Sequence, residues 1–291
     1  RTIYTLGVLA VLFASCSKES PLDGEQYYKQ VYIVGAYEVV QQFDVAYGDG
    51  PQNAYVAVAT GGSQNIDRNV EVVLTHNDAT IEWYNNKYKL HAPLKYQKLA
   101  DQFCSFPSMS TTVKAGDVCS RLPFTVETSE LDCDKLYALT FKIESVSDYV
   151  KQPKDTVLIM NLNLTNDFSG TYQMVAIRYT LTDNDEELTP SSVNMQRTLK
   201  AVNKNQARFF NVTQNSDLSP TGNITSEDYF NSIDNNGVTF TRQPDGTFTV
   251  AGWKNLPVSN GTVSFEDGTF TFCYDYESGG KRYRLRGTMT K

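Results

Sequence analysis

Histidine is the side chain used most often as a general base, and this sequence contains only two, His76 and His91. Nucleophilic catalysis requires such a base beside a serine, cysteine or threonine. Neither histidine lies near a Gly-x-Ser-x-Gly motif, which marks the exposed serine of one large class of hydrolases. Both are expected to be ordinary boundary or surface residues, and no catalytic residue is predicted.

Carboxylates are abundant, with 33 Asp and Glu residues in the chain. A glycosidase needs two of them roughly 5–10 Å apart across a cleft, and no segment singles out such a pair. Residues 183–187 (Asp-Asn-Asp-Glu-Glu) offer oxygen ligands at alternate positions, as a hard cation such as Ca²⁺ requires. They lack the glycine and the distal glutamate of an EF-hand loop, so a solvated acidic hairpin tip is favoured. No metal and no cofactor is predicted.

Three arginines alternate with other residues near the C-terminus, at Arg282, Arg284 and Arg286. Alternation in a strand places all three guanidinium groups on one face. Such a face is a candidate anion-binding site for uronate or sulfate groups, because arginine binds planar anions with two parallel hydrogen bonds. The favoured alternative is structural: a solvent-facing edge strand whose charges discourage edge-to-edge pairing.

Two groups of aromatic residues are candidates for stacking against the apolar faces of sugar rings. Trp83, Tyr84 and Tyr88 form one, and Trp253 with Asn255 forms the other. Core packing between a helix and a sheet is at least as good an explanation for Trp83. Trp253 lies in a connecting loop and is expected to be the more exposed of the two tryptophans.

The elements that position these residues are predicted to be mostly β-strands, as 18 Tyr and 15 Phe residues suggest. Turn signals separate short strand-like segments in the first half of the chain. A short helix is predicted at residues 79–89, where Ile81, Tyr84 and Tyr88 recur at helical spacing. Strands of this length and spacing predict a sandwich. The predicted strands are residues 31–34, 38–47, 54–60, 70–76, 111–114, 123–127, 136–145 and 156–165.

After a boundary expected at residues 165–168, the pattern changes to a β-meander. Asn236-Gly237, Asp245-Gly246 and Asp267-Gly268 are two-residue hairpin turn signals. Phe270, Phe272, Tyr274 and Tyr276 share one strand face, and an up-and-down barrel of about eight strands fits the whole segment. One short helix is expected near residues 226–230. The predicted strands are residues 238–242, 247–251, 263–266, 269–276 and 281–290.

Composition excludes some classes of function. The formal net charge is −7, so a basic surface large enough to hold nucleic acid is not expected. Cys104, Cys119, Cys133 and Cys273 form no Cys-x-x-Cys pair, and with two histidines they give no zinc signature. Free thiols are favoured over disulfides.

The first 16 residues combine a positive start, an apolar run, small residues and Cys16. This order is typical of a secretory signal, and the run is too short to span a bilayer. The segment resembles a bacterial lipoprotein signal, with Cys16 as the lipidation site, although Phe13 stands where leucine is usual. Residues 17–26 are predicted to be a flexible tether, followed by an all-β sandwich at 27–165 and a barrel at 166–291.

Several segments of the first half, taken together, match the pattern of a known family: residues 30–36 (Gln-Val-Tyr-Ile-Val-Gly-Ala), 72–77 with 83–85, 112–116 and 131–137. They resemble the immunoglobulin-like N-terminal domain of Bacteroidetes lipoproteins linked to polysaccharide-utilisation loci. The same domain precedes the catalytic barrel of some family 18 glycoside hydrolases. Residues 169–172 and 195–199 resemble the lipocalin-like partner domain of these lipoproteins. In lipocalins a late arginine packs over an aromatic residue of the first strand, which here is Tyr172.

This resemblance implies a non-catalytic, lipid-anchored protein at the outer-membrane surface that binds glycan beside other uptake proteins. The Asp-x-x-Asp-x-Asp-x-Glu motif of family 18 enzymes is absent from the sequence. Two alternatives are a structural or adhesive module and a barrel that carries a small apolar ligand in its lumen. A third and less favoured alternative is a glycosidase with an unrecognised carboxylate pair.

Overall fold

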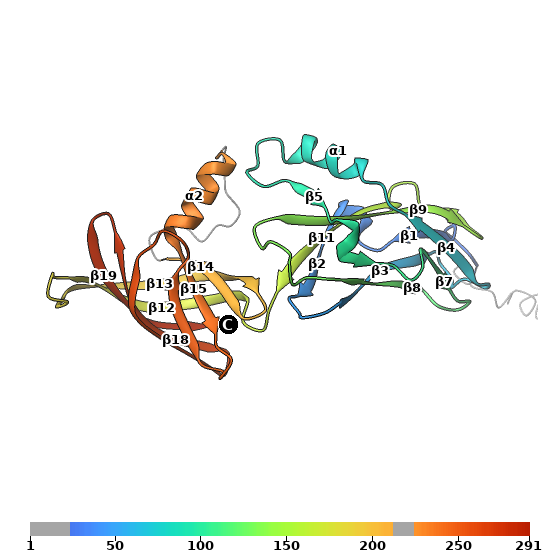
Figure 1. Cartoon of the computed structure of the whole chain (residues 1–291). Coiled ribbons are helices and arrows are strands. Elements are labelled where there is room, and N and C mark those ends of the chain that lie inside the picture. The colour runs from blue at the N-terminus through green and yellow to red at the C-terminus, as the bar shows by residue number, and fades with distance from the viewer. Residues whose placement is uncertain (1–23, 212–223) are drawn as a thin grey trace, which may run out of the picture.

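The computed structural model describes residues 24–211 and 224–291. Figure 1 shows two β-domains in a row, with strands β1 to β11 in the first and β12 to β19 in the second. The predicted lipidation site Cys16 and most of the predicted tether lie outside the described residues. Within the described part, no helix is both long and apolar enough to cross a membrane.

The first domain contains two sheets that curl around a shared core, as predicted for a sandwich. One sheet consists, in order across it, of β10 (Val150–Lys151), β1 (Gln30–Ile33), β3 (Gln52–Gly61), β8 (Cys119–Val126) and β6 (Cys104–Ser105). The other consists of β2 (Val40–Ala46), β11 (Val157–Thr165), β9 (Leu136–Val146), β4 (Val70–Thr75) and β7 (Ser110–Val113), with β5 (Tyr96–Lys98) paired to β9. We call these the first sheet and the second sheet.

The core between the sheets forms because each strand alternates apolar and polar residues, so that one face can be buried. Val56, Val58 and Phe124 of the first sheet pack in one core with Val72 and Phe141 of the second sheet. Outside this core, the second sheet carries helix α1 (Ala79–Tyr88). Two single-turn helices, η1 (Ala36–Glu38) and η2 (Asp101–Phe103), complete the domain.

The second domain is a closed antiparallel barrel of eight strands, as predicted. Strand β19 pairs with β18 on one side and with β12 on the other, which closes the barrel. The strands are β12 (Gly170–Leu181), β13 (Glu187–Asn203), β14 (Gln206–Phe210), β15 (Gly237–Arg242), β16 (Phe248–Gly252), β17 (Val258–Glu266), β18 (Thr269–Ser278) and β19 (Lys281–Thr290).

Aromatic rings fill the barrel interior. Phe270, Phe272 and Tyr274 are at most 3% exposed. The Phe270 ring centroid lies 4.4 Å from that of Phe265 and 4.8 Å from that of Phe240. These separations are those of rings in direct contact. The interior is therefore packed, which counts against the carrier alternative.

Helix α2 (Ser226–Asn236) is longer than predicted and corrects one turn assignment. Asn236 is the last residue of α2 and Gly237 the first of β15, so the predicted hairpin turn at Asn236-Gly237 is wrong. Gly237 has φ −76°, whereas the hairpin turn expected there needs positive φ. The helix begins at Thr225, whose hydroxyl accepts a 3.0 Å hydrogen bond from the Asp228 backbone N–H.

The two domains meet through a buried ion pair and an apolar cluster. Asp134 of the first domain accepts hydrogen bonds of 2.5 and 2.9 Å from Arg208 of β14, and Lys200 lies 3.3 Å away. Beside them Phe210, Tyr229 and Ile233 form a buried cluster against which Leu94 packs. The hydroxyl of Ser226 also donates a 2.6 Å hydrogen bond to the carbonyl of Pro93.

Candidate functional site

Helix α1 is fixed to the outer face of the second sheet by one apolar and one polar contact. Ile81 is buried against Ala138 and Ile159 of the sheet. The Asn85 amide donates a 2.8 Å hydrogen bond to the Tyr96 carbonyl and accepts a 3.0 Å bond from the Tyr96 N–H. These contacts hold α1 in one orientation and turn its opposite face to solvent.

Trp83, Tyr84 and Tyr88, which we call the aromatic cluster, lie on and beside that face. Trp83 is 46% exposed and Tyr88 57% exposed, and their ring centroids are 5.9 Å apart. The Lys87 ammonium group lies 5.1 Å from the Trp83 centroid and 5.0 Å from that of Tyr88. Tyr84 is half-buried between Tyr88 and Tyr96. Trp83 is therefore not a core residue, and the stacking surface predicted for this helix is accessible.

Trp253 and Asn255 are in a different situation. Trp253 is half-buried, with the Arg208 guanidinium carbon 4.6 Å from its ring centroid. Its indole N–H is buried without a hydrogen-bond partner among the described residues. Asn255 is exposed, and its amide donates a 3.1 Å hydrogen bond to Asn235. The expectation that Trp253 is the more exposed tryptophan is wrong, because its ring covers Arg208 at the junction of the domains.

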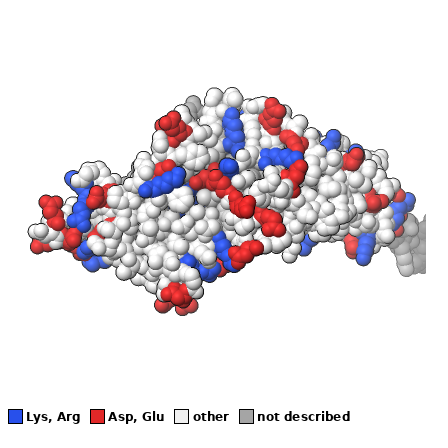
Figure 2. Space-filling view, viewed as in Figure 1, with Lys and Arg blue, Asp and Glu red and all other residues white. Residues whose placement is uncertain are grey.

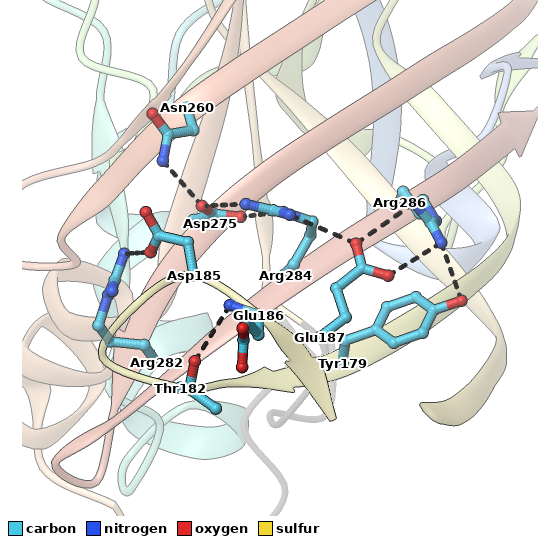
Figure 3. A network of polar contacts seen from close by, with 10 residues as sticks. All are labelled: Tyr179, Thr182, Asp185, Glu186, Glu187, Asn260, Asp275, Arg282, Arg284 and Arg286. Carbon is cyan, nitrogen blue, oxygen red and sulfur yellow. Dashed lines mark hydrogen bonds and ion pairs between the residues drawn. The ribbon is translucent and has the colours of Figure 1, made fainter. Parts of the chain in front are cut away.

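Arg282, Arg284 and Arg286 of β19, which we call the arginine ladder, are paired with carboxylates, as Figure 3 shows. Arg282 lies 2.6 Å from Asp185, and Arg284 donates hydrogen bonds of 2.7 and 2.9 Å to the two oxygens of Asp275. Hydrogen bonding to Asp275 raises the pKa of Arg284 above the ordinary value for arginine. An anion binding here would have to compete with carboxylates that are already in place.

Arg286 completes the ladder by donating hydrogen bonds to Glu187 at 3.1 Å and to the Tyr179 hydroxyl at 3.0 Å. Asp185 and Glu187 belong to the acidic segment 183–187, so this hairpin and the ladder neutralise each other (Figure 3). Strand β19 is not an edge strand, because β12 pairs with it. The residue over the Tyr172 ring is Lys291, whose ammonium group is 5.9 Å from the centroid, rather than an arginine of the ladder.

Charges of both signs are interspersed over the face of the molecule drawn in Figure 2. On this face no extended surface carries basic residues alone, as the phosphates of nucleic acid would require.

A polar cavity of about 640 Å³ lies at the junction of the domains. Its volume falls within the range of typical small-molecule sites. We call it the junction groove. The first domain contributes Gln42, Asp44, Leu94, Cys133, Lys135, Leu136, Asn161, Leu162, Asn163, Leu164 and Thr165, and the rest of the wall is Asn166, Ser169, Gly170, Thr198, Leu199, Lys200, Ala201, Tyr229 and Lys291.

Among the described residues, the one group of possible metal ligands and the histidine His76 already make other contacts. Among the described residues, Asp132, Cys133 and Asp134 place possible ligand atoms within 4.8 Å of one another. Asp134 is bound to Arg208 and Lys200, and burial raises the pKa of Cys133 to about 11, so this thiol is protonated. His76 lies 2.6 Å from the Thr140 carbonyl through Nδ1 and packs against Phe106.

The four described cysteines, Cys104, Cys119, Cys133 and Cys273, are free thiols. Cys133 is buried and Cys119 exposed, and the other two lie between these extremes. None contributes a covalent link to the fold of the described residues.

The geometry above defines a class of protein: a two-domain, all-β protein with a sandwich and a closed, packed barrel. Family models match the chain in two places, one for an N-terminal domain at residues 27–150 and one for a C-terminal domain at residues 156–290. The chain belongs to the two-domain family that these models describe. The two matched ranges fall on the sandwich and on the barrel, in the order that the resemblance of the sequence implies.

Solved structures with the same fold come from Bacteroides. A protein of unknown function from Bacteroides ovatus is 17% identical, with a TM-score of 0.62 over 90% of this chain and 94% of that chain. An auxiliary nutrient binding protein from Bacteroides thetaiotaomicron is 16% identical, with a TM-score of 0.58 over 88% of this chain and 91% of that chain. At these identities the likeness establishes the fold alone. No curated protein matches the chain.

Sequence reasoning identified the aromatic cluster but not the junction groove. A signal for the groove was present in β11, where Asn161 and Asn163 alternate with Leu162 and Leu164. Asparagine is disfavoured in strands, so two of them on one face of a buried strand indicate that this face meets something polar. The opposite wall, at Thr198 and Lys200, carried no comparable signal.

Proposed function

We propose that this protein binds glycan without catalysing its breakdown, and that the aromatic cluster on α1 is the binding surface. We further propose that it is a lipoprotein, anchored through Cys16 in the outer membrane and exposed at the cell surface. There it would work beside other surface proteins that take up glycan. The nutrient-binding description of one structural neighbour supports this role.

The observation that carries the proposal is the exposure of Trp83 and Tyr88 on a rigidly held helix. Exposing two large rings side by side costs the protein favourable burial. Rings of this kind provide large contact areas at little cost in conformational entropy. Neighbouring Asn86 is also exposed, and Lys87 lies over both rings. The surface therefore combines apolar faces with polar groups, as the two faces of a pyranose ring require.

The test is affinity electrophoresis of residues 20–291, which include every described residue, through gels containing plant, host or microbial polysaccharides. We expect one class of polysaccharide to retard the wild-type protein. Replacing Trp83 and Tyr88 together by alanine should weaken that retardation roughly tenfold or more, as loss of aromatic anchors does at other interfaces.

Tyr55→Ala is the matched control, because this exposed tyrosine lies on the first sheet, away from α1. It should leave retardation unchanged, and circular dichroism should show that every variant is folded. Failure of every polysaccharide to retard the wild-type protein would refute glycan binding. Retardation that survives in Trp83→Ala/Tyr88→Ala would place the site elsewhere.

A further inference from the structure

The junction groove contains many uncharged groups that can form hydrogen bonds. Eight of its twenty lining residues carry an amide or a hydroxyl group: Gln42, Asn161, Asn163, Thr165, Asn166, Ser169, Thr198 and Tyr229. Its charged groups are partly engaged, since Lys200 pairs with Asp134 and Lys291 donates a 2.9 Å hydrogen bond to the Ser169 carbonyl. A wall of this kind suits a neutral ligand with many hydroxyl groups better than a charged or apolar one.

Asn161 has unused hydrogen-bonding capacity. Its Oδ1 is shielded from solvent and accepts no hydrogen bond from the described residues. A buried polar atom without a partner lowers stability, and in a native structure it calls for an explanation. Rotation of the amide about its terminal bond would let a ligand hydroxyl bond to this side chain.

The polar groups next to Asn161 are held in place before any ligand arrives. Asn163 donates a 2.7 Å hydrogen bond to Asp44 Oδ1, and Gln42 donates a 3.3 Å bond to the same oxygen. These bonds leave the Asn163 carbonyl oxygen and the second Asp44 oxygen available to accept. Preorganised groups of this kind reduce the entropy lost on binding.

The width of the groove is fixed by the contacts between the domains. Asp134 and Arg208 form two hydrogen bonds across the junction, and the Arg208 side chain is 2% exposed. Tyr229 belongs both to the groove wall and to the buried cluster beside this pair. The two walls therefore form one site rather than two separate surfaces.

We infer that the junction groove binds a segment of a neutral oligosaccharide, with Asn161 and Asn163 bonding to its hydroxyl groups. This inference rests on the proposed function and extends it to a second subsite. Ile159 lies beneath α1, while Asn161 and Asn163 follow on the same face of β11. Asn163 is thus about 13 Å along the strand from the position beneath α1. One glycan chain can reach both places.

The experiment measures binding of hexasaccharides of β-1,4-glucan, β-1,4-mannan and α-1,4-glucan to residues 20–291 by calorimetry. Asn161→Leu removes the amide at nearly constant volume, and Thr198→Trp fills the groove from the barrel side. We expect Asn161→Leu to weaken binding about 3- to 10-fold, the usual effect of losing one neutral hydrogen bond, and Thr198→Trp to weaken it further. The control Asn194→Leu changes an exposed asparagine of β13, the strand that contains Thr198, and should have no effect on binding.

Hydrogen–deuterium exchange of the same samples distinguishes this inference from the proposed function. Protection of both β11 and α1 by the bound hexasaccharide is the expected result. Protection confined to α1, with unchanged affinity in Asn161→Leu and Thr198→Trp, would overturn the groove and leave the proposed function intact. Absence of binding by any hexasaccharide, in a protein that no polysaccharide retards, would overturn both.

Discussion

Asp134 is the residue on which the polar contact between the domains depends. Burial alone would raise the pKa of its carboxyl group, but hydrogen bonds and charge from Arg208, with the charge of Lys200, outweigh this effect and lower the pKa. The ionised form is therefore the form that the folded protein stabilises. Because Arg208 is itself buried, removing its partner leaves a charge without compensation.

We predict that Asp134→Asn lowers the free energy of unfolding at pH 7 by about 3 kcal/mol, the usual effect of breaking a buried ion pair. A carboxyl group with a lowered folded-state pKa stabilises the protein above its unfolded pKa of about 4 and loses this effect as the pH falls. Urea denaturation at pH 7 and pH 3 should show this loss in the wild type and a smaller one in Asp134→Asn.

The neighbouring exposed acid provides the control for this prediction, since Asp132→Asn removes the same charge without breaking the pair. It should change the free energy of unfolding by less than about 0.5 kcal/mol. Equal effects of the two substitutions would show that Asp134 acts through net charge alone.

For single residues, the sequence predicted local secondary structure better than it predicted the surroundings of each side chain. The spacing of Ile81, Tyr84 and Tyr88 predicted a helix with one apolar stripe, and in α1 Ile81 is buried whereas Tyr88 is 57% exposed. The environment of Trp253 depends on Arg208, which is distant in the chain, so the surrounding residues gave no indication of it. The arginine ladder is a similar case, because its carboxylate partners come from two different strands and a hairpin.

Among the elements, strand β18 determines whether the barrel can carry a ligand. Its inward-facing residues Phe270, Phe272 and Tyr276 contact rings from other strands, and Tyr274 contacts the rings of Phe272 and Tyr276. The alternation of these residues predicted the inward face, but whether the lumen was open also depended on Phe240 of β15, which is distant from β18 in the chain. The rings occupy the space that an apolar ligand would need.

We predict that Phe270→Ala lowers the free energy of unfolding by about 3–5 kcal/mol, because it leaves a cavity where a ring with 0% exposure stood. Wild-type protein should not increase the fluorescence of a hydrophobic dye, whereas this variant should. Phe230→Ala, on α2 outside the barrel, is the control and should not bind dye. Strong dye binding by the wild type would restore the carrier alternative.

Of the three turn dipeptides predicted in the barrel, two form hairpins for a clear physical reason. Gly246 and Gly268 have φ +86° and +75°, values that favour glycine over other residues. Gly237 belongs to a similar dipeptide but does not need positive φ, since α2 extends to Asn236. That extension buries Ile233 in a cluster with Tyr229 and Phe210, against which Leu94 of the first domain packs. A local sequence pattern cannot reveal a surface from another domain.

For the whole molecule, the apolar cluster at the junction joins the two domains into one cooperative unit. Phe210, Tyr229 and Ile233 are each at most 5% exposed. We predict one calorimetric unfolding transition for the wild type and two for Phe210→Ala, since weaker coupling lets each domain unfold at its own temperature. Phe210→Leu keeps most of the buried area and should retain a single transition. A single transition in both variants would contradict this coupling.

The fold class, including the sandwich and the eight-stranded barrel, was predictable because it follows from local alternation and turns. The junction groove was not, because its walls combine residues near 42, 161, 198 and 229. Only the packing of one domain against the other brings these segments together.

The pairing of the strands also has a consequence for the order in which the chain folds. In each domain a late strand pairs with an early one: Ile159 of β11 with Val40 of β2, and Met289 of β19 with Met174 of β12. Contacts between such distant segments form slowly. As the chain is synthesised from its N-terminus, the sandwich can assemble once β11 is available, but the barrel must wait for β19. Until then β12 and β18 have open edges, and this interval is when the protein is most exposed to aggregation and to proteases.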